Sequence, residues 1–232
     1  VGGCAQAVCS RLGRCDLYEM SAYQARGRIM SEGYSIVYAD PPWEVQGGPR
    51  WSGISGPSKP LPYPTMTVEE IKQLPVKELA AKDAHLYLWT INKYVEQAYA
   101  IARSWGFSVS CMLTWCKPRH GLGIGGAFVQ TTEYLLFCRR GALETRTRVD
   151  TTWFLRERLR HSEKPSMFRD MIVKVSGDLP RIELFAREEP DGWDVWGNEV
   201  GSGVELSDLV GKPLHKAVSE KRPRKRRQHL PF

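Results

Sequence analysis

The sequence predicts an α/β fold in which a mostly parallel central sheet is flanked by helices. Short apolar runs at residues 34–39, 84–90 and 107–116 are typical of buried strands, and the first and third of them are bounded by glycine and proline. Residues 67–74 and 92–105 instead carry apolar side chains every three or four positions, which is typical of helices packed on one face. Strands and helices therefore alternate along the chain, as they do in α/β proteins.

Capping residues, helix-breaking residues and apolar periodicity predict the bounds of the helices and strands after residue 66. Thr67 and Glu70 have the spacing of a capping box, so a helix is predicted to begin there and to end before Pro75. Asn92 is predicted to cap the next helix, which ends at Gly106. Further strands are predicted at 132–138, 151–155 and 181–186, and a further helix at 166–175.

The length of 232 residues and the hydrophobic content of 42% fit one large domain, or at most two. We expect one domain over residues 1–205, of which 1–13 show little pattern, and a basic C-terminal tail over 206–232. The net charge of +7 is concentrated in the run 221–227. Such a run indicates affinity for a polyanion, a nuclear-import signal or a solubilising tail.

The six cysteines show neither Cys-x-x-Cys pairs nor histidine at zinc-finger spacing. We therefore expect reduced thiols of an intracellular protein, and no metal site. No apolar run approaches the length of a membrane span, and no signal peptide is recognised, so no membrane partner is expected.

The first strand ends at the tetrad Asp40-Pro41-Pro42-Trp43, where reactive groups of open α/β sheets usually lie. A carboxylate and proline carbonyls with no neighbouring N–H are acceptors for an exocyclic amino group, and the indole of Trp43 is a stacking surface. Acceptors that hold both hydrogens of such an amine favour its attack on an electrophilic methyl. The plainer interpretation is a strand followed by a Pro-Pro turn with a packing tryptophan.

With this tetrad, the chain resembles the adenine-N6 methyltransferases that include the catalytic subunit of the messenger-RNA adenosine methyltransferase. Bacterial and phage DNA-modifying enzymes belong to the same family, and the resemblance runs from about residue 16 to residue 200. It implies a Rossmann-like methyltransferase fold and S-adenosylmethionine as methyl donor. It implies catalytic roles for Asp40, Pro41, Pro42 and Trp43.

The resemblance also implies binding residues outside the tetrad. The cofactor-binding positions would be Asp16, Leu17, Asp40, Lys164, Arg187, Asn198 and Glu199. The substrate-binding positions would be Trp43, Tyr63, Lys117, Arg119 and His120, with residues 44–64 forming a lid. Glu133 matches an acidic family position and is interpreted as structural. The chain departs from the family pattern at Phe128-Val129-Gln130 and at Glu189-Pro190, where basic or hydrogen-bonding groups are expected.

The resemblance favours DNA as the nucleic-acid partner because the chain is as compact as the bacterial and phage members. RNA, a non-catalytic nucleic-acid-binding subunit, and N-methylation of a small molecule or protein stay open as alternatives. A homodimer or a heterodimer is compatible with the family. The expected location is the cytoplasm of a bacterial or phage-infected cell, or the nucleus if the source is eukaryotic.

Overall fold

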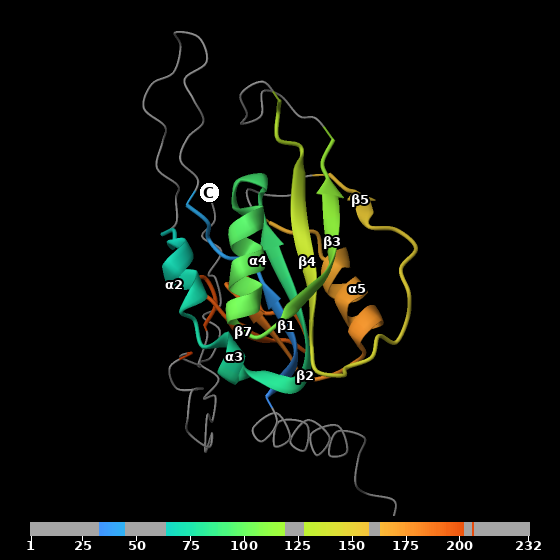
Figure 1. Ribbon diagram of the computed structural model, residues 1–232. Coiled ribbons are helices and arrows are strands. Elements are labelled where there is room, and N and C mark those ends of the chain that lie inside the picture. Colours follow the sequence, from blue (N-terminus) through green and yellow to red (C-terminus); the bar gives the residue numbers. More distant parts are fainter. Residues whose placement is uncertain (1–32, 45–63, 119–127, 158–162, 202–205, 207–232) are drawn as a thin grey trace, which may run out of the picture.

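The computed structural model describes residues 33–44, 64–118, 128–157, 163–201 and 206 (Figure 1). These residues form a seven-stranded sheet in the order β5-β3-β4-β2-β1-β6-β7. β4 runs antiparallel to its neighbours β2 and β3, and the other strand pairs are parallel, which confirms the predicted mostly parallel sheet. The strands are β1 (Tyr34–Ala39), β2 (Ala80–Thr90), β3 (Ser108–Cys116), β4 (Thr132–Arg140), β5 (Trp153–Leu155), β6 (Arg181–Leu184) and β7 (Asp194–Trp196).

The described helices are α2 (Val68–Lys72), α3 (Val76–Leu79), the 3₁₀ helix η1 (Asn92–Tyr94), α4 (Val95–Ser104) and α5 (Met167–Ser176). The capping box at the start of α2 is confirmed, because Thr67 and Glu70 exchange side-chain-to-backbone hydrogen bonds. The prediction that Asn92 caps α4 is wrong: Asn92 opens η1, and Tyr94 is the residue that precedes α4. The one-turn helix α3 was not predicted.

Each face of the sheet has its own hydrophobic core. α4 lies over one face together with α2 and α3, whereas α5 covers the other face (Figure 1). Alternate residues of β1 enter the two cores: Val37 and Ala39 pack towards α4, and Ile36 and Tyr38 pack towards α5. A strand buried on both faces is apolar throughout, which explains the continuous run in the sequence. Leu206 also belongs to the α4-side core.

The register of the sheet brings several strand ends to one edge. Ala39, the last residue of β1, is paired with Leu184 at the end of β6, and Leu184 is paired with Trp196 at the end of β7. Because β4 is antiparallel, its first residues lie beside the last residues of β3. The residues that follow β1, β3, β6 and β7 therefore share one edge with the start of β4, and we call it the carboxyl edge.

Candidate active site

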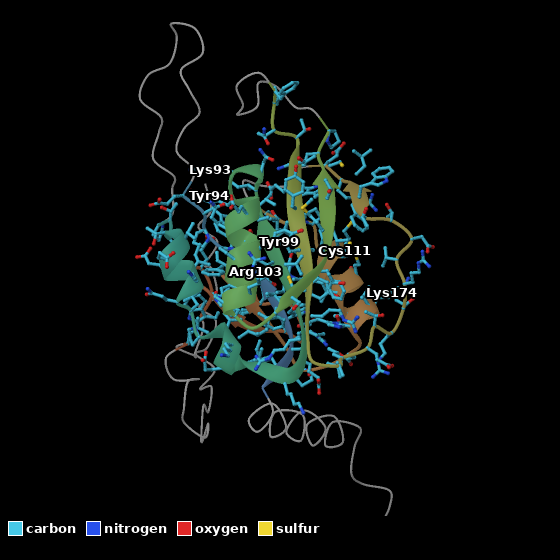
Figure 2. The ribbon with its side chains drawn as sticks, viewed as in Figure 1. Lys93, Tyr94, Tyr99, Arg103, Cys111 and Lys174 are labelled. Carbon is cyan, nitrogen blue, oxygen red and sulfur yellow. The ribbon has the colours of Figure 1, made fainter. Side chains whose placement is uncertain are left out.

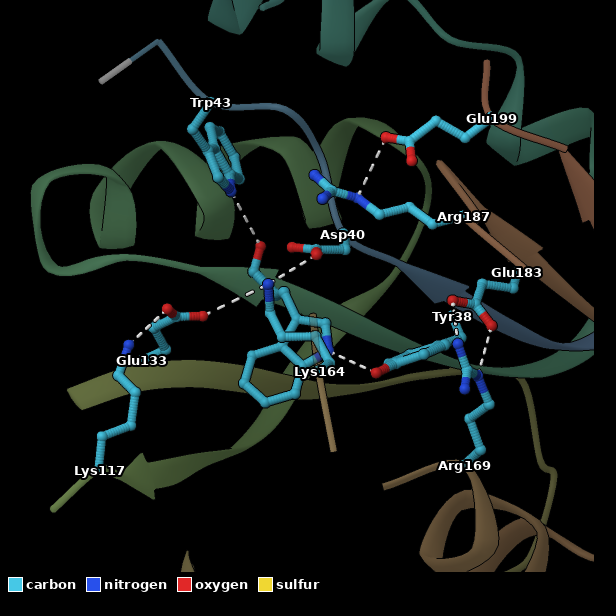
Figure 3. A network of polar contacts seen from close by, with 11 residues as sticks. Tyr38, Asp40, Trp43, Lys117, Glu133, Lys164, Arg169, Glu183, Arg187 and Glu199 are labelled. Atoms are coloured by element: carbon cyan, nitrogen blue, oxygen red, sulfur yellow. Dashed lines mark hydrogen bonds and ion pairs between the residues drawn. The ribbon is translucent and has the colours of Figure 1, made fainter. Parts of the chain in front are cut away.

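A chain of alternating charges crosses the carboxyl edge at the end of β1 (Figure 3). The Nζ atom of Lys164 donates to Asp40 Oδ2 at 2.6 Å and lies 3.4 Å from Glu133 Oε2. The side chain of Lys164 is 11% exposed, that of Glu133 19% and that of Asp40 23%. Lys164 comes from the segment before α5 and Glu133 from the start of β4, so the contacts join three elements. The structure thus brings two predicted site residues, Asp40 and Lys164, into direct contact.

Lys117 lies at the far end of this charge chain. Its Nζ atom donates to Glu133 Oε1 at 2.5 Å, its side chain is only 8% exposed, and it sits over the Trp115 ring. Lys117 is thus paired with Glu133 inside the charge chain, and its role in meeting phosphate stays a prediction. Glu133, which sequence reasoning treated as structural, touches two cations and belongs to the site itself.

The two carboxylates are driven in opposite directions by their surroundings. Burial raises the pKa of Asp40 above its ordinary value, and the charges of Lys164 and Arg187 oppose this rise. Burial would also raise the pKa of Glu133, but Lys164 and Lys117 outweigh it and hold that pKa below its usual range. Burial would lower the pKa of Lys164, yet its two carboxylate partners raise it, so the lysine stays charged. The site therefore holds a charged lysine between two carboxyl groups whose pKa values are shifted in opposite directions.

Both proline carbonyls of the tetrad already accept a backbone hydrogen bond. The N–H of Trp43 donates to Pro41 O at 2.9 Å, and the N–H of Met66 donates to Pro42 O at 2.9 Å. These bonds differ from the expectation that the two oxygens have no local donor. A carbonyl oxygen has two lone pairs, so each of these oxygens keeps one further acceptor site.

The indole of Trp43 is held from several sides. It is 6% exposed, its Nε1 atom donates to Trp89 O at 3.2 Å, and its ring stacks on Tyr94 with centroids 5.1 Å apart and an interplanar angle of 17°. Tyr94, which lies at the start of α4 beside Lys93 (Figure 2), also donates from its hydroxyl to Glu44 O at 2.5 Å. The prediction of Trp43 as an open stacking surface is corrected to that of a buried side chain with one face on Tyr94.

Replacing Trp43 should therefore cost stability first. We expect Trp43→Ala to lower the free energy of unfolding by about 3–5 kcal/mol, the usual cost of truncating a buried large aromatic side chain. Trp43→Phe, which keeps a ring on Tyr94, should lose much less. Chemical denaturation of both variants measures this difference, and an unchanged stability for Trp43→Ala would contradict the buried position.

Arg187 and Glu199 reach the carboxyl edge from the segments after β6 and β7. The Nε atom of Arg187 lies 3.6 Å from Glu199 Oε1, and the positive charge of Arg187 acts on Asp40 by lowering its pKa. Asn198, next to Glu199, is exposed. The structure therefore places Arg187, Asn198 and Glu199 at the same edge as Asp40, as the sequence predicted. Asp16, Leu17, Tyr63, Arg119 and His120 lie outside the described residues, as does most of the predicted lid.

The backbone fixes Arg187 through a close approach at Gly197. A Cβ atom added to Gly197 would lie 2.2 Å from Ala186 O and 2.7 Å from Ala186 N. We expect Gly197→Ala to push the two segments apart and to lower the melting temperature. Differential scanning calorimetry tests this, with Gly201→Ala as control because its nearest contact would be 3.6 Å away.

Other site classes find little support in the described part of the chain. Among its residues no group of three or more His, Cys, Asp or Glu side chains could hold a metal ion. Within the same ranges, none of the helices has the length and apolarity to cross a bilayer.

Comparison with known proteins adds an independent line of evidence. The sequence profile of the MT-A70 family matches residues 34–199, which contain the whole charge chain. A type II methyltransferase of Mycoplasma sp, M.MunI, is 32% identical over 183 residues, covering 72% of this chain and 78% of that protein. The human N(6)-adenosine-methyltransferase catalytic subunit METTL3 is 26% identical over 184 residues, covering 75% of this chain and 29% of that protein. The human N(6)-adenine-specific methyltransferase METTL4 is 26% identical over 193 residues, covering 72% of this chain and 37% of that protein. The chain therefore belongs to the MT-A70 family.

Proposed function

We propose that this protein transfers a methyl group from S-adenosylmethionine to the N6 atom of adenine in DNA. One observation carries the proposal: Asp40 and Pro41 directly follow the carboxyl end of β1, where Lys164 is paired with Asp40, within the segment matched by the MT-A70 family. Both human relatives are named as N(6) methyltransferases, METTL3 of adenosine and METTL4 of adenine.

The donor set at the carboxyl edge fits S-adenosylmethionine. That molecule carries a carboxylate, an ammonium, a ribose diol and a sulfonium, so it needs cations, anions and hydrogen-bonding groups together. Lys164 and Arg187 would bind its carboxylate, Asp40 would face its positive groups, and Asn198 and Glu199 would bind ribose hydroxyls. When bound, the cofactor supplies an electrophilic methyl group on sulfur.

The residues of the tetrad act on the adenine amine. Asp40 accepts a hydrogen bond from one N6–H and the second lone pair of Pro41 O accepts one from the other, which turns the nitrogen lone pair towards the methyl group. The N6–C bond forms as the C–S bond breaks, and the N6 proton passes to Asp40 or to water. An adenine within a duplex must first leave the base stack, at a cost of a few kcal/mol.

DNA is favoured over RNA as the substrate because this chain matches a type II methyltransferase over more of that protein's length than it matches METTL3 or METTL4. M.MunI matches this chain over most of its own length, whereas METTL3 and METTL4 are covered for less than two fifths of theirs. A DNA substrate would place the protein in the cytoplasm of a bacterial or phage-infected cell, or in the nucleus of a eukaryotic one. The retained Asp40 and its cation partner speak against a purely non-catalytic binding subunit.

The substrate can be tested without knowing its recognition sequence. Unmodified DNA made by polymerase chain reaction, and RNA transcribed from it, offer the same set of sequences. With methyl-labelled cofactor, we expect label in DNA, lower incorporation in RNA and none in free adenosine. Label confined to RNA would replace DNA by RNA, and label confined to free adenosine or protein would overturn the proposal for nucleic acid.

A further inference from the structure

The segment between β6 and β7, which contains Arg187, begins with a residue in a strained backbone conformation. Phe185, the residue after β6, has a φ of 64°, which lies in the left-handed region that non-glycine residues avoid. Such a conformation persists only where the surroundings enforce it. On one side, the rings of Phe185 and Trp196 pack edge-on with their centroids 5.3 Å apart, and the N–H of Ala186 donates to Trp196 O at 2.9 Å.

On the other side, one guanidinium group ties the segment to α5 and β6. Arg169 donates from Nε to Glu183 Oε2 at 2.7 Å and from Nη2 to Glu183 Oε1 at 3.0 Å. Its Nη1 atom donates to Glu188 Oε1 at 2.6 Å. Figure 3 shows the planar fork of Arg169 against Glu183, with Arg187 on the neighbouring segment. The two glutamates flank Arg187 in sequence, so Arg169 anchors the chain before and after it.

The two ion pairs of Arg169, with Glu183 and with Glu188, differ in burial and therefore in role. Glu183 is 8% exposed and Arg169 14%, so their bidentate pair is part of the folded core. Glu188 is 59% exposed, and exposed ion pairs add little to global stability. The ion pair with Glu188 therefore adds little to the free energy of unfolding. It can still restrict the segment that contains Arg187, because Glu188 is the next residue in the chain.

We propose that the Arg169–Glu188 bridge is a positioning device that holds Arg187 where it binds the cofactor. This inference rests on the proposed function, since it assumes that Arg187 contacts S-adenosylmethionine. α5 and the segment before it then supply two clamps to the carboxyl edge: Lys164 on Asp40, and Arg169 on the Arg187 segment. A lysine at 169 could not replace the arginine, because it lacks the fork that bonds both glutamates at once.

A second ion pair on β6 provides a matched control. Arg181 at the start of β6 is 13% exposed and pairs with Asp178 at 2.5 Å, and Asp178 is 85% exposed. The pair has the same chemistry as the Arg169–Glu188 bridge but lies at the opposite end of the strand. Removing its carboxylate tests whether losing any such bridge is enough to affect the site.

The experiment compares Glu188→Ala, Glu188→Gln and Asp178→Ala in the full chain. We expect Glu188→Ala to raise the Kd and KM for S-adenosylmethionine about fivefold, equivalent to about 1 kcal/mol. The kcat at saturating cofactor, the KM for DNA and the melting temperature should stay at wild-type values. Glu188→Gln should fall between wild type and Glu188→Ala, and Asp178→Ala should match wild type.

Hydrogen exchange of the segment 185–189 gives a readout that does not depend on activity. Faster exchange there in Glu188→Ala, but not in Asp178→Ala, is the expected result. Unchanged exchange and unchanged cofactor affinity in Glu188→Ala would overturn the inference, as would an equal effect of Asp178→Ala. If wild-type protein binds no S-adenosylmethionine, the proposed function fails together with the cofactor role of the bridge, whereas the exchange comparison still shows whether the bridge holds the segment.

Discussion

Asp40→Asn should reduce methyl transfer at least about 10²-fold, because one charged, preorganised acceptor at a reacting centre is commonly worth that much. The amide keeps the shape of the side chain but lacks the negative charge that holds the amine and faces the sulfonium. Lys164 retains Glu133 as a partner at 3.4 Å, so the variant should still fold. Single-turnover kinetics with labelled cofactor measure the rate, and circular dichroism checks the fold.

The control for this variant is Asp170→Asn, an exposed aspartate on α5 away from the charge chain. It should methylate at the wild-type rate. A wild-type single-turnover rate for Asp40→Asn would remove the carboxylate from the mechanism and leave the tetrad as a structural turn.

Lys164→Met should lower activity and shift its dependence on pH. Burial raises the pKa of Asp40, and the charge of Lys164 is the largest influence that opposes this rise. Without that charge the pKa of Asp40 rises further, so the carboxylate is protonated at a higher pH on acidification. We therefore expect the acid limb of the pH–rate profile to move to higher pH in Lys164→Met, at saturating cofactor.

Lys164→Arg keeps a cation and should move the acid limb much less. Lys174→Met removes an exposed lysine from α5 (Figure 2) and should leave the profile unchanged. An acid limb that stays in place in Lys164→Met, or moves to lower pH, would show that the ion pair does not control the ionisation that limits the rate.

The elements with strong local patterns were predicted correctly from the sequence. β1 is buried on both faces, so its apolar run is unbroken, and the capping box of α2 is encoded within four residues. α3 and η1 were missed because each is about one turn long, too short to show a helical period. β2 begins at Ala80, earlier than predicted, because Lys82 and Asp83 interrupt its apolar pattern although they lie within the strand.

The site was predicted in part, because its contacts are far apart in sequence. The tetrad directly follows β1 and Arg187 lies three residues after the end of β6, so their place at the carboxyl edge could be inferred from topology. Lys164 and Asp40 are 124 residues apart in sequence, so no local sequence pattern predicts their contact. The ion pair of Lys117 could not be predicted for the same reason: its partner Glu133 lies on the antiparallel strand β4. The ring that covers Trp43 belongs to Tyr94, the last residue of η1, which lies far from Trp43 in sequence.

The central claim is that Asp40 and its neighbours methylate the exocyclic nitrogen of adenine in nucleic acid. The most direct measurement is mass spectrometry of nucleosides from DNA and RNA of cells lacking adenine methylation, expressing either wild type or Asp40→Asn. The cell's own nucleic acid presents every recognition sequence. We predict N6-methyldeoxyadenosine in DNA from cells with wild type and none with Asp40→Asn. Its absence from both DNA and RNA with well-folded wild type, or equal amounts with Asp40→Asn, would contradict the account.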